Sequence, residues 1–301
     1  MSSTLPVIAA VDGSDDGLRA LDWALDDAHR RGAPLRVVHV RQYAIWAQPE
    51  VLAAGPPDPD DDPVLDQVRK YLEGRTDRPD VEYQGLEGAP GVLLPELGST
   101  AQLLVLGSRG RGGFAGLLLG SNGMAAARDA ECPVVVVPRP GREVQGDVPA
   151  GPGPRMVVGL QVDSPDEATL AFAFDEAALR GARLHVIAAY AWPLQTWASP
   201  GELVPPVIDQ NAVENETWAL AEGFLAPHRS RHPDVRADAY AMPGGAAGLL
   251  VAASKDAELV VVGRHRRRLL APARMMGSVT QAVLLHAAAP VAVVPPGPGE
   301  E

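Results

Sequence analysis

The chain has 301 residues, a length typical of about two domains, and its 46% hydrophobic and 5% aromatic residues suit globular folding. Its formal net charge of −12 argues against nucleic acid or anionic lipid as a partner, because those phosphate surfaces attract basic proteins. No stretch reads as a signal peptide or as about 18 uncharged apolar residues in succession, so we expect a cytoplasmic protein that crosses no membrane.

Apolar runs of strand length recur along the first half of the chain. Continuous runs of this kind suit strands that are covered on both faces, as in parallel sheets. In chain order they are PVIAAV at 6–11, PLRVVHV at 34–40, a weaker VEYQG from Val81, QLLVLG at 102–107 and PVVVVP at 133–138.

The segments between these runs have helical patterns. Residues 15–31 place Leu18, Leu21 and Leu25 largely on one side, and Ser14 is a candidate N-cap. A short helix is expected around residues 63–73, and another runs through MAAARDA before the last strand. The alternation of strands and helices predicts a parallel sheet with right-handed crossovers and helices on both faces. Ligands of such sheets bind beyond the carboxyl ends of the strands.

The second half repeats the first. The segment VIAAVDGSDDGLRALDWALDDAHRRGAPLRVVHV at 7–40 parallels MVVGLQVDSPDEATLAFAFDEAALRGARLHVIAA at 156–189, and CPVVVVP at 132–138 parallels APVAVVP at 289–295. The repeat predicts an α/β protein of two tandem doubly wound domains. The predicted boundaries are a first domain at 1–140, a linker at 141–154, a second domain at 155–296 and a tail at 297–301.

A glycine-rich loop follows the fourth apolar run. Gly107, Gly110, Gly120 and Ser121 are spaced as G-x2-G-x9-G-S in GSRGRGGFAGLLLGSNG. Glycines at a strand end let the backbone approach a phosphate, and the helix that begins at Gly120–Ser121 adds unpaired N–H donors. The loop is neither a Walker loop, because no Lys-Ser or Lys-Thr follows the last glycine, nor the dinucleotide fingerprint, which follows a first strand.

Polar side chains accompany this loop. The Ser121 hydroxyl is suited to donate to a phosphate oxygen or to ligate Mg²⁺, and Arg109 and Arg111 either supply charge or are solvated loop arginines. Asp12 ends the first run, where its carboxylate is suited to accept from an adenine amino group or a ribose hydroxyl. The alternative for Asp12 is a turn residue that caps the next helix. Val40, at the end of the second run, borders the same crevice.

At these residues the chain resembles tandem members of the universal stress protein family, of the ATP-binding subgroup. The resemblance implies five-stranded parallel sheets of order 3-2-1-4-5, with ATP across the ends of the first and fourth strands. It also implies dimerisation through the fifth strand. Because the fifth runs of both copies are apolar, we expect a homodimer and an intrachain antiparallel pseudo-dimer through these strands. Carried over, it assigns the adenosine end to Ala10, Val11, Asp12 and Val40, and the ribose and phosphates, with Mg²⁺ accompanying a triphosphate, to Leu106, Gly107, Arg109, Gly110, Gly120, Ser121 and Asn122.

The chain departs from the family pattern in both halves. Asn122 and Gly123 stand where members often have Val and then Ser or Thr, so one hydroxyl is lost. In the second half Gln161 replaces Asp12, and Arg266 replaces the second glycine of the loop. We therefore predict that the second loop is degenerate, although the basic cluster from Arg264 to Arg268 either attracts an anion or is a solvated loop.

The sequence offers no catalytic set. It lacks a G-x-S-x-G elbow, the lone Cys132 is interpreted as a small buried side chain, and His39 as a packing residue. We therefore expect an ATP-binding regulatory protein of the stress response, with at most slow hydrolysis. Two alternatives stay open: an interaction scaffold that binds no nucleotide, and an ATP-dependent enzyme of a related adenine-nucleotide fold.

Overall fold

The structure is a computed structural model, and it describes residues 4–42, 62–75, 78–110, 118–144, 146, 153–191, 209–264 and 276–297. The first half contains β1 (Val7–Val11), α1 (Asp15–Arg31), β2 (Leu35–Arg41), α3 (Pro63–Leu72), β3 (Val81–Glu87), α4 (Pro90–Glu96), the 3-10 helix η1 (Leu97–Thr100), β4 (Leu103–Gly107), α5 (Ser121–Asp129) and β5 (Val134–Val137). The second half contains β6 (Arg155–Leu160), α6 (Glu167–Arg180), β7 (Arg183–Tyr190), α7 (Gln210–Arg231), β8 (Ala237–Pro243), α8 (Ala246–Ala253), β9 (Leu259–Gly263), α9 (Ser278–His286) and β10 (Val291–Val294).

All ten strands form one sheet, in the order β3-β2-β1-β4-β5-β10-β9-β6-β7-β8. Each half is parallel throughout and keeps the order 3-2-1-4-5. The predicted class of two tandem doubly wound α/β units is therefore confirmed. In detail the two five-stranded parts merge into a single mixed sheet.

The two halves join through their fifth strands. β5 and β10 pair antiparallel, with Val134 opposite Val293 and Val136 opposite Val291. This is the intrachain pairing expected from the two apolar fifth strands, and it removes two strand edges that would otherwise be open to aggregation. A homodimer through the fifth strands would require this pair to separate.

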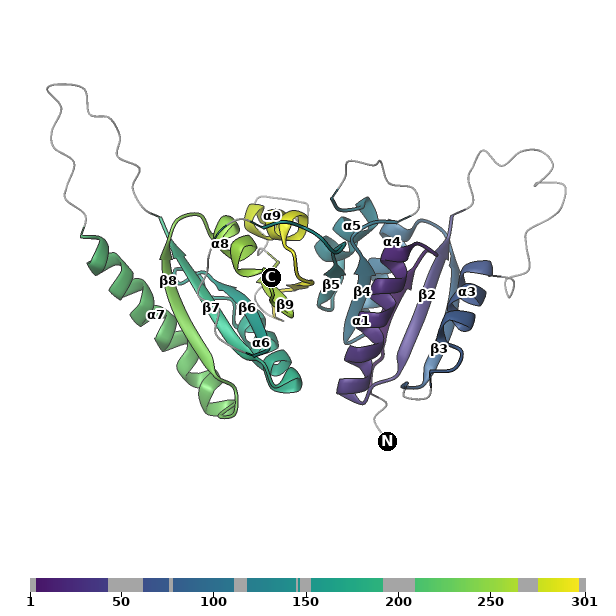
Figure 1. Cartoon of the computed structure of the whole chain (residues 1–301), viewed down its shortest axis with the longest axis horizontal. Helices are drawn as coiled ribbons and strands as arrows, with labels where there is room; N and C mark the ends of the chain where they lie inside the picture. Colours follow the sequence, from purple (N-terminus) through teal and green to yellow (C-terminus); the bar gives the residue numbers. More distant parts are fainter. Residues whose placement is uncertain are drawn as a thin grey trace, which may run out of the picture.

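Helices cover both faces of the sheet, and an apolar layer on each face runs through both halves. Leu21 of α1 and Phe174 of α6 belong to one layer. Ala126 of α5 and Val283 of α9 belong to the other. Figure 1 shows α5 and α9 above the junction of the halves, and α1 and α6 below it. Among the helices that the structure describes, none has the length and apolar character to cross a membrane.

Local signals explain where α1 begins and ends. Ser14 is extended and its hydroxyl accepts from Gly17 N–H, so the predicted N-cap is confirmed. Asp15 and Asp16 lie in the first turn, where the helix dipole favours negative charge. The helix ends at Gly32, whose φ of 59° is the left-handed conformation that glycine adopts most readily. These caps fix the turn between β1 and α1.

Four charged side chains join α1 to α6 beneath the junction. Asp27 and Arg31 of α1 occupy the same positions of the repeat as Glu176 and Arg180 of α6. Each arginine pairs with the acid of its own helix and with that of the other, Arg31 with Glu176 and Arg180 with Asp27. Asp27 and Glu176 are 0% and 1% exposed, so neither carboxylate is hydrated once the halves are joined.

Removing one cation from this network should destabilise the protein strongly, because it leaves a buried carboxylate with too few partners. We expect Arg180→Met to lower the free energy of unfolding by about 3–5 kcal/mol, measured by urea denaturation. The matched control is Arg75→Met, which removes a pair with Asp22 whose side chains are 38% and 40% exposed and should cost less than about 1 kcal/mol. Equal losses for the two variants would contradict this assignment.

Cys132 lies just before β5 and is 5% exposed. Burial raises the pKa of its thiol to about 12, so almost no thiolate forms near neutral pH. The interpretation as a buried structural thiol therefore agrees with its environment.

We expect Cys132 in the native protein to resist iodoacetamide at pH 8 and to react at the rate of an ordinary thiol in denaturant. Mass spectrometry of the alkylated peptide measures both rates. Comparable rates in the two conditions would show that the thiol is accessible in the folded chain.

Candidate functional site

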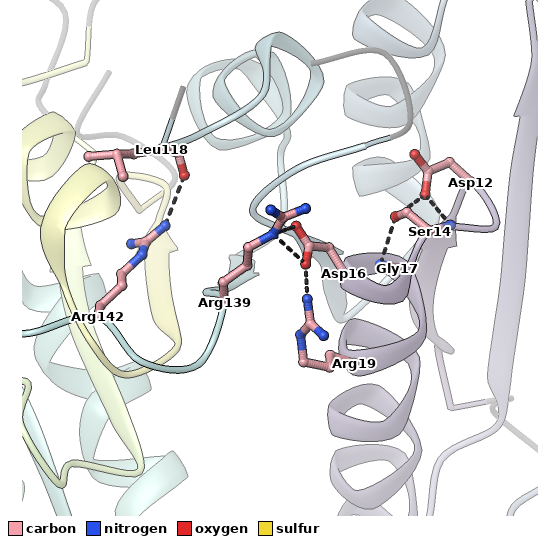
Figure 2. Close-up of polar contacts among 8 residues, drawn as sticks. All are labelled: Asp12, Ser14, Asp16, Gly17, Arg19, Leu118, Arg139 and Arg142. Carbon is pink, nitrogen blue, oxygen red and sulfur yellow. Dashed lines mark hydrogen bonds and ion pairs between the residues drawn. The ribbon is translucent and has the colours of Figure 1, made fainter. Parts of the chain in front are cut away.

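The turn after β1 holds Asp12 in a defined position. Asp12 Oδ1 accepts hydrogen bonds from Ser14 N–H at 3.1 Å and from the Ser14 hydroxyl at 2.5 Å (Figure 2). The Ser14 oxygen in turn caps α1 through Gly17 N–H. One carboxylate oxygen of Asp12 thus performs the turn function that was the alternative interpretation of this residue.

The other carboxylate oxygen faces the loop after β4. A Cβ on Gly110 would lie 2.5 Å from Asp12 Oδ2, so only glycine fits here without displacing the carboxylate. Gly120 N–H donates to Ser108 O at 2.8 Å, and a Cβ on Gly120 would lie 4.0 Å from the Arg109 Cα. The end of β1, the end of β4 and the start of α5 therefore converge, as the sequence predicts for this edge of the sheet.

Gly107 has a packing role in this structure. A Cβ there would lie 2.5 Å from the backbone oxygen of Asp16, in the first turn of α1. The Asp16 side chain is 1% exposed and pairs with Arg19 and with Arg139, whose Nε is 2.7 Å from Asp16 Oδ2 (Figure 2). Gly107 lets β4 approach α1 closely, which differs from the phosphate-approach role that the loop pattern suggests for it.

Apolar side chains form the adjoining part of the sheet. Val40 and Leu106 belong to the apolar layer on the α4–α5 face, and Ala10 packs against it. Val11 belongs to the layer on the α1 face, so only its backbone is available at the crevice. Ala10 and Leu106 are direct neighbours across β1 and β4. Ala10, Val40 and Leu106 thus place apolar side chains near the strand end that carries Asp12.

The start of α5 is not capped by a side chain. Gly120 is the N-cap, and Ser121 and Asn122 are exposed. Asn122 Oδ1 lies 3.6 Å from the position of a Cβ on Gly91, so this side chain contacts the start of α4. The first N–H groups of α5 and the Ser121 hydroxyl are therefore the polar groups presented at this end of the loop.

Gly123 stands where family members often have Ser or Thr, and a side chain at this position would be crowded. A Cβ there would lie 3.1 Å from side-chain carbons of both Leu106 and Leu119. Thr280 occupies the corresponding position in the second half, and its hydroxyl donates to Gly263 O at 2.8 Å. The hydroxyl that the first half lacks is thus used for a backbone contact in the second half.

Two residues near the loop were not predicted from the sequence. The hydroxyl of Ser108 is buried without a hydrogen-bond partner in the described part of the chain. Arg142, just beyond β5, donates to Leu118 O at 2.8 Å (Figure 2). Ser108 lies inside the glycine pattern, whereas nothing in the sequence connects Arg142 to the loop. The predicted Arg111 lies outside the described residues.

In the described residues, the second half differs from the first at both ends of this arrangement. Gln161 replaces Asp12, and Arg264 is 7% exposed and donates from Nη1 to Ala130 O of the first half at 2.6 Å. Arg264 thus contributes to the joint between the halves and is no solvated loop arginine. Arg266 and Arg268 lie outside the described residues.

His39 is engaged in a structural contact. Its Nδ1 lies 2.8 Å from Oδ2 of Asp62, the N-cap of α3. Burial opposes the charge of Asp62, but the hydrogen bonds with His39 and with Leu65 N–H lower its pKa below the ordinary value. Within the described ranges, no three His, Cys, Asp or Glu side chains are grouped to hold a metal ion.

Comparisons with known proteins agree with this geometry. The sequence model of the universal stress protein family matches residues 5–138 and 154–295. The chain is also 35% identical to a universal stress protein of Mycobacterium tuberculosis, over 95% of this chain and 96% of the relative. The chain belongs to the universal stress protein family.

A solved structure of the family has the same fold over nearly the whole chain. A universal stress protein from Archaeoglobus fulgidus superposes with a TM-score of 0.60 at 16% identity, over 98% of this chain and 97% of that one. A universal stress protein solved in complex with cAMP is 29% identical, covers 45% of this chain and 97% of its own, and has a TM-score of 0.33.

Substitution by alanine should destabilise the protein more at Gly107 than at Gly120, the first and last glycines of the loop pattern. We expect Gly107→Ala to lower the free energy of unfolding by about 2–3 kcal/mol, because its Cβ meets backbone that cannot yield easily. Gly120→Ala has no atom closer than 3.8 Å to its new Cβ and should cost about 1 kcal/mol or less. Urea denaturation of both variants measures the difference, and equal losses would contradict the packing role of Gly107.

Proposed function

We propose that this universal stress protein is a cytoplasmic regulatory protein whose first half binds ATP at the carboxyl ends of β1 and β4. The observation that carries the proposal is the close approach of Gly110 to Asp12 beside the uncapped start of α5. A space bounded by a carboxylate, bare backbone and helix N–H groups suits a ligand with a hydrogen-bonding base at one end and phosphates at the other.

The residues present fit the adenosine end of ATP. Asp12 Oδ1 is held by Ser14, and Oδ2 lies on the side of Gly110. A carboxylate oxygen accepts hydrogen bonds from an amino group or a sugar hydroxyl. Ala10, Val40 and Leu106 provide the apolar surface on which a base or ribose packs.

The residues also fit the phosphates. The N-terminus of α5 carries the positive end of the helix dipole, and Arg109 adds charge between the two glycines that mark the loop. Ser121 is exposed at the start of α5, and the hydroxyl of Ser108, just after β4, is buried without a partner in the described chain. When bound, Mg²⁺ would shield the charge of the triphosphate, and its ligands would come mainly from phosphate and water.

The geometry favours binding over turnover. Phosphoryl transfer to water needs a positioned base or orienting group at the terminal phosphate. Asp12 is held by Ser14 and is assigned to the nucleoside end in this proposal, and His39 is paired with Asp62. We infer that occupancy of the site changes the conformation or the association of the protein, with hydrolysis at most slow.

Calorimetric titration of the full chain with ATP and Mg²⁺ tests the proposal, with GTP and cAMP as comparison ligands. We expect one site per chain, because the second half has Gln161 in place of Asp12. GTP lacks the adenine amino group and cAMP lacks the polyphosphate, so both should bind more weakly than ATP.

Two variants and a control locate the site. Gly110→Val displaces the Asp12 carboxylate and should abolish binding. Asp12→Asn keeps an acceptor for Ser14 but removes the charge, and should weaken binding by about tenfold or more. Asp15→Asn changes an exposed carboxylate in the first turn of α1, and this variant should bind ATP as the parent protein does. Absence of ATP binding by nucleotide-free parent protein would instead favour a scaffold that binds no nucleotide.

A further inference from the structure

Arg142 connects the first glycine-rich loop to the second half of the protein. Its guanidinium donates to Leu118 O, two residues before the N-cap of α5. The same guanidinium donates to Ala287 O at 3.0 Å and reaches Leu284 O at 3.5 Å, at the C-terminal end of α9. The carbonyls at a helix C-terminus carry the negative end of the dipole, so a cation is stabilised there.

Arg264 makes the corresponding contact in the opposite direction. It directly follows β9, as Ser108 follows β4, and it begins the loop of the second half. Its Nη1 donates to Ala130 O, the carbonyl of the residue that caps the C-terminus of α5. Each loop is therefore bonded by one guanidinium to the C-terminal end of the helix that begins at the other loop.

We propose that Arg142 is a positioning residue that transmits occupancy of the first loop to α9, and through α9 to the loop of the second half. The inference rests on the proposed function, since it describes how occupancy of the ATP site would affect the other half. α9 is the element that would respond, because its N-terminus lies at Gly277 in the second loop and its C-terminus lies at Arg142.

The charges near the loop give the direction of the effect. Burial lowers the pKa of Arg142, and the nearby positive charge of Arg109 lowers it further. A phosphate bound beside Arg109 would offset the repulsion between the two guanidinium groups, so that Arg142 keeps its three carbonyl contacts at a lower electrostatic cost. Ligand binding should therefore tighten the contact between Arg142 and α9, and a rigid α9 should in turn favour the ligand.

Amide hydrogen exchange of the full chain, with and without saturating ATP and Mg²⁺, tests this coupling. In the parent protein we expect ATP to slow exchange of the amides of residues 283–287 by about fivefold, although they belong to the other half. Arg142→Met should lose this remote effect. Arg142→Lys keeps the charge but lacks the planar fork that spans Leu118 and Ala287, so it should lose most of the effect as well.

Arg128→Met is the matched control. Arg128 lies on α5, is 46% exposed and pairs with its neighbour Asp129, so its removal should leave the remote effect intact. Thermal unfolding and calorimetric titration of the same samples establish that each variant is folded and binds ATP.

The outcomes separate the two proposals. Binding of ATP without slower exchange at residues 283–287 in the parent would overturn the coupling and leave ATP binding intact. The same holds if Arg142→Met and Arg142→Lys keep the full remote effect. A parent protein that gives no heat of binding would overturn both proposals, because no occupancy would exist to transmit.

Discussion

The antiparallel pairing of β5 with β10 determines how the two halves of the molecule are placed relative to each other. Since the strands run in opposite directions, the carboxyl end of β5 is beside the amino end of β10. Helices that follow parallel strands return antiparallel to them, so the C-terminus of α9 comes to the edge where the first loop begins. The reverse holds for α5 and the second loop. Arg142 and Arg264 can bridge the halves only because of this arrangement.

The same pairing gives the two faces of the joint different chemistry. On the face of α1 and α6, the contact contains the charged network of Asp27, Arg31, Glu176 and Arg180. On the face of α5 and α9, apolar side chains meet around the fifth strands, and arginines bond to backbone carbonyls at helix ends. Buried charges require their partners, which fixes the orientation of one half on the other. On the other face, Arg142 and Arg264 hold helix ends through backbone carbonyls, and the proposed response to ligand would pass there.

Much of the fold could be predicted from the sequence because its signals are local. The apolar runs, the helix between residues 15 and 31, the Ser14 cap and the repeat each depend on neighbours in the chain. The convergence of Asp12 with Gly110 also followed, since strand ends of a parallel sheet meet at one edge. The contacts that escaped prediction are long-range: Gly107 is required by Asp16, and Arg142 and Arg264 bond to carbonyls more than a hundred residues away or in the facing half. Backbone carbonyls have no sequence signature, so such partners appear only once the chain is folded.

These contacts give a physical reason for the loss of family residues in the second half. A loop that binds phosphate needs bare backbone and a free approach, whereas the second half begins its loop with a guanidinium buried against α5. Arg264 there holds the C-terminal end of α5, the helix whose N-terminus lies at the proposed site of the first half. Two identical chains could not divide these roles, since any change in one loop would appear in both. Joining the copies in one chain, with β5 and β10 paired, allows one loop to keep Asp12 and its glycines while the other specialises in holding the helix that completes the first.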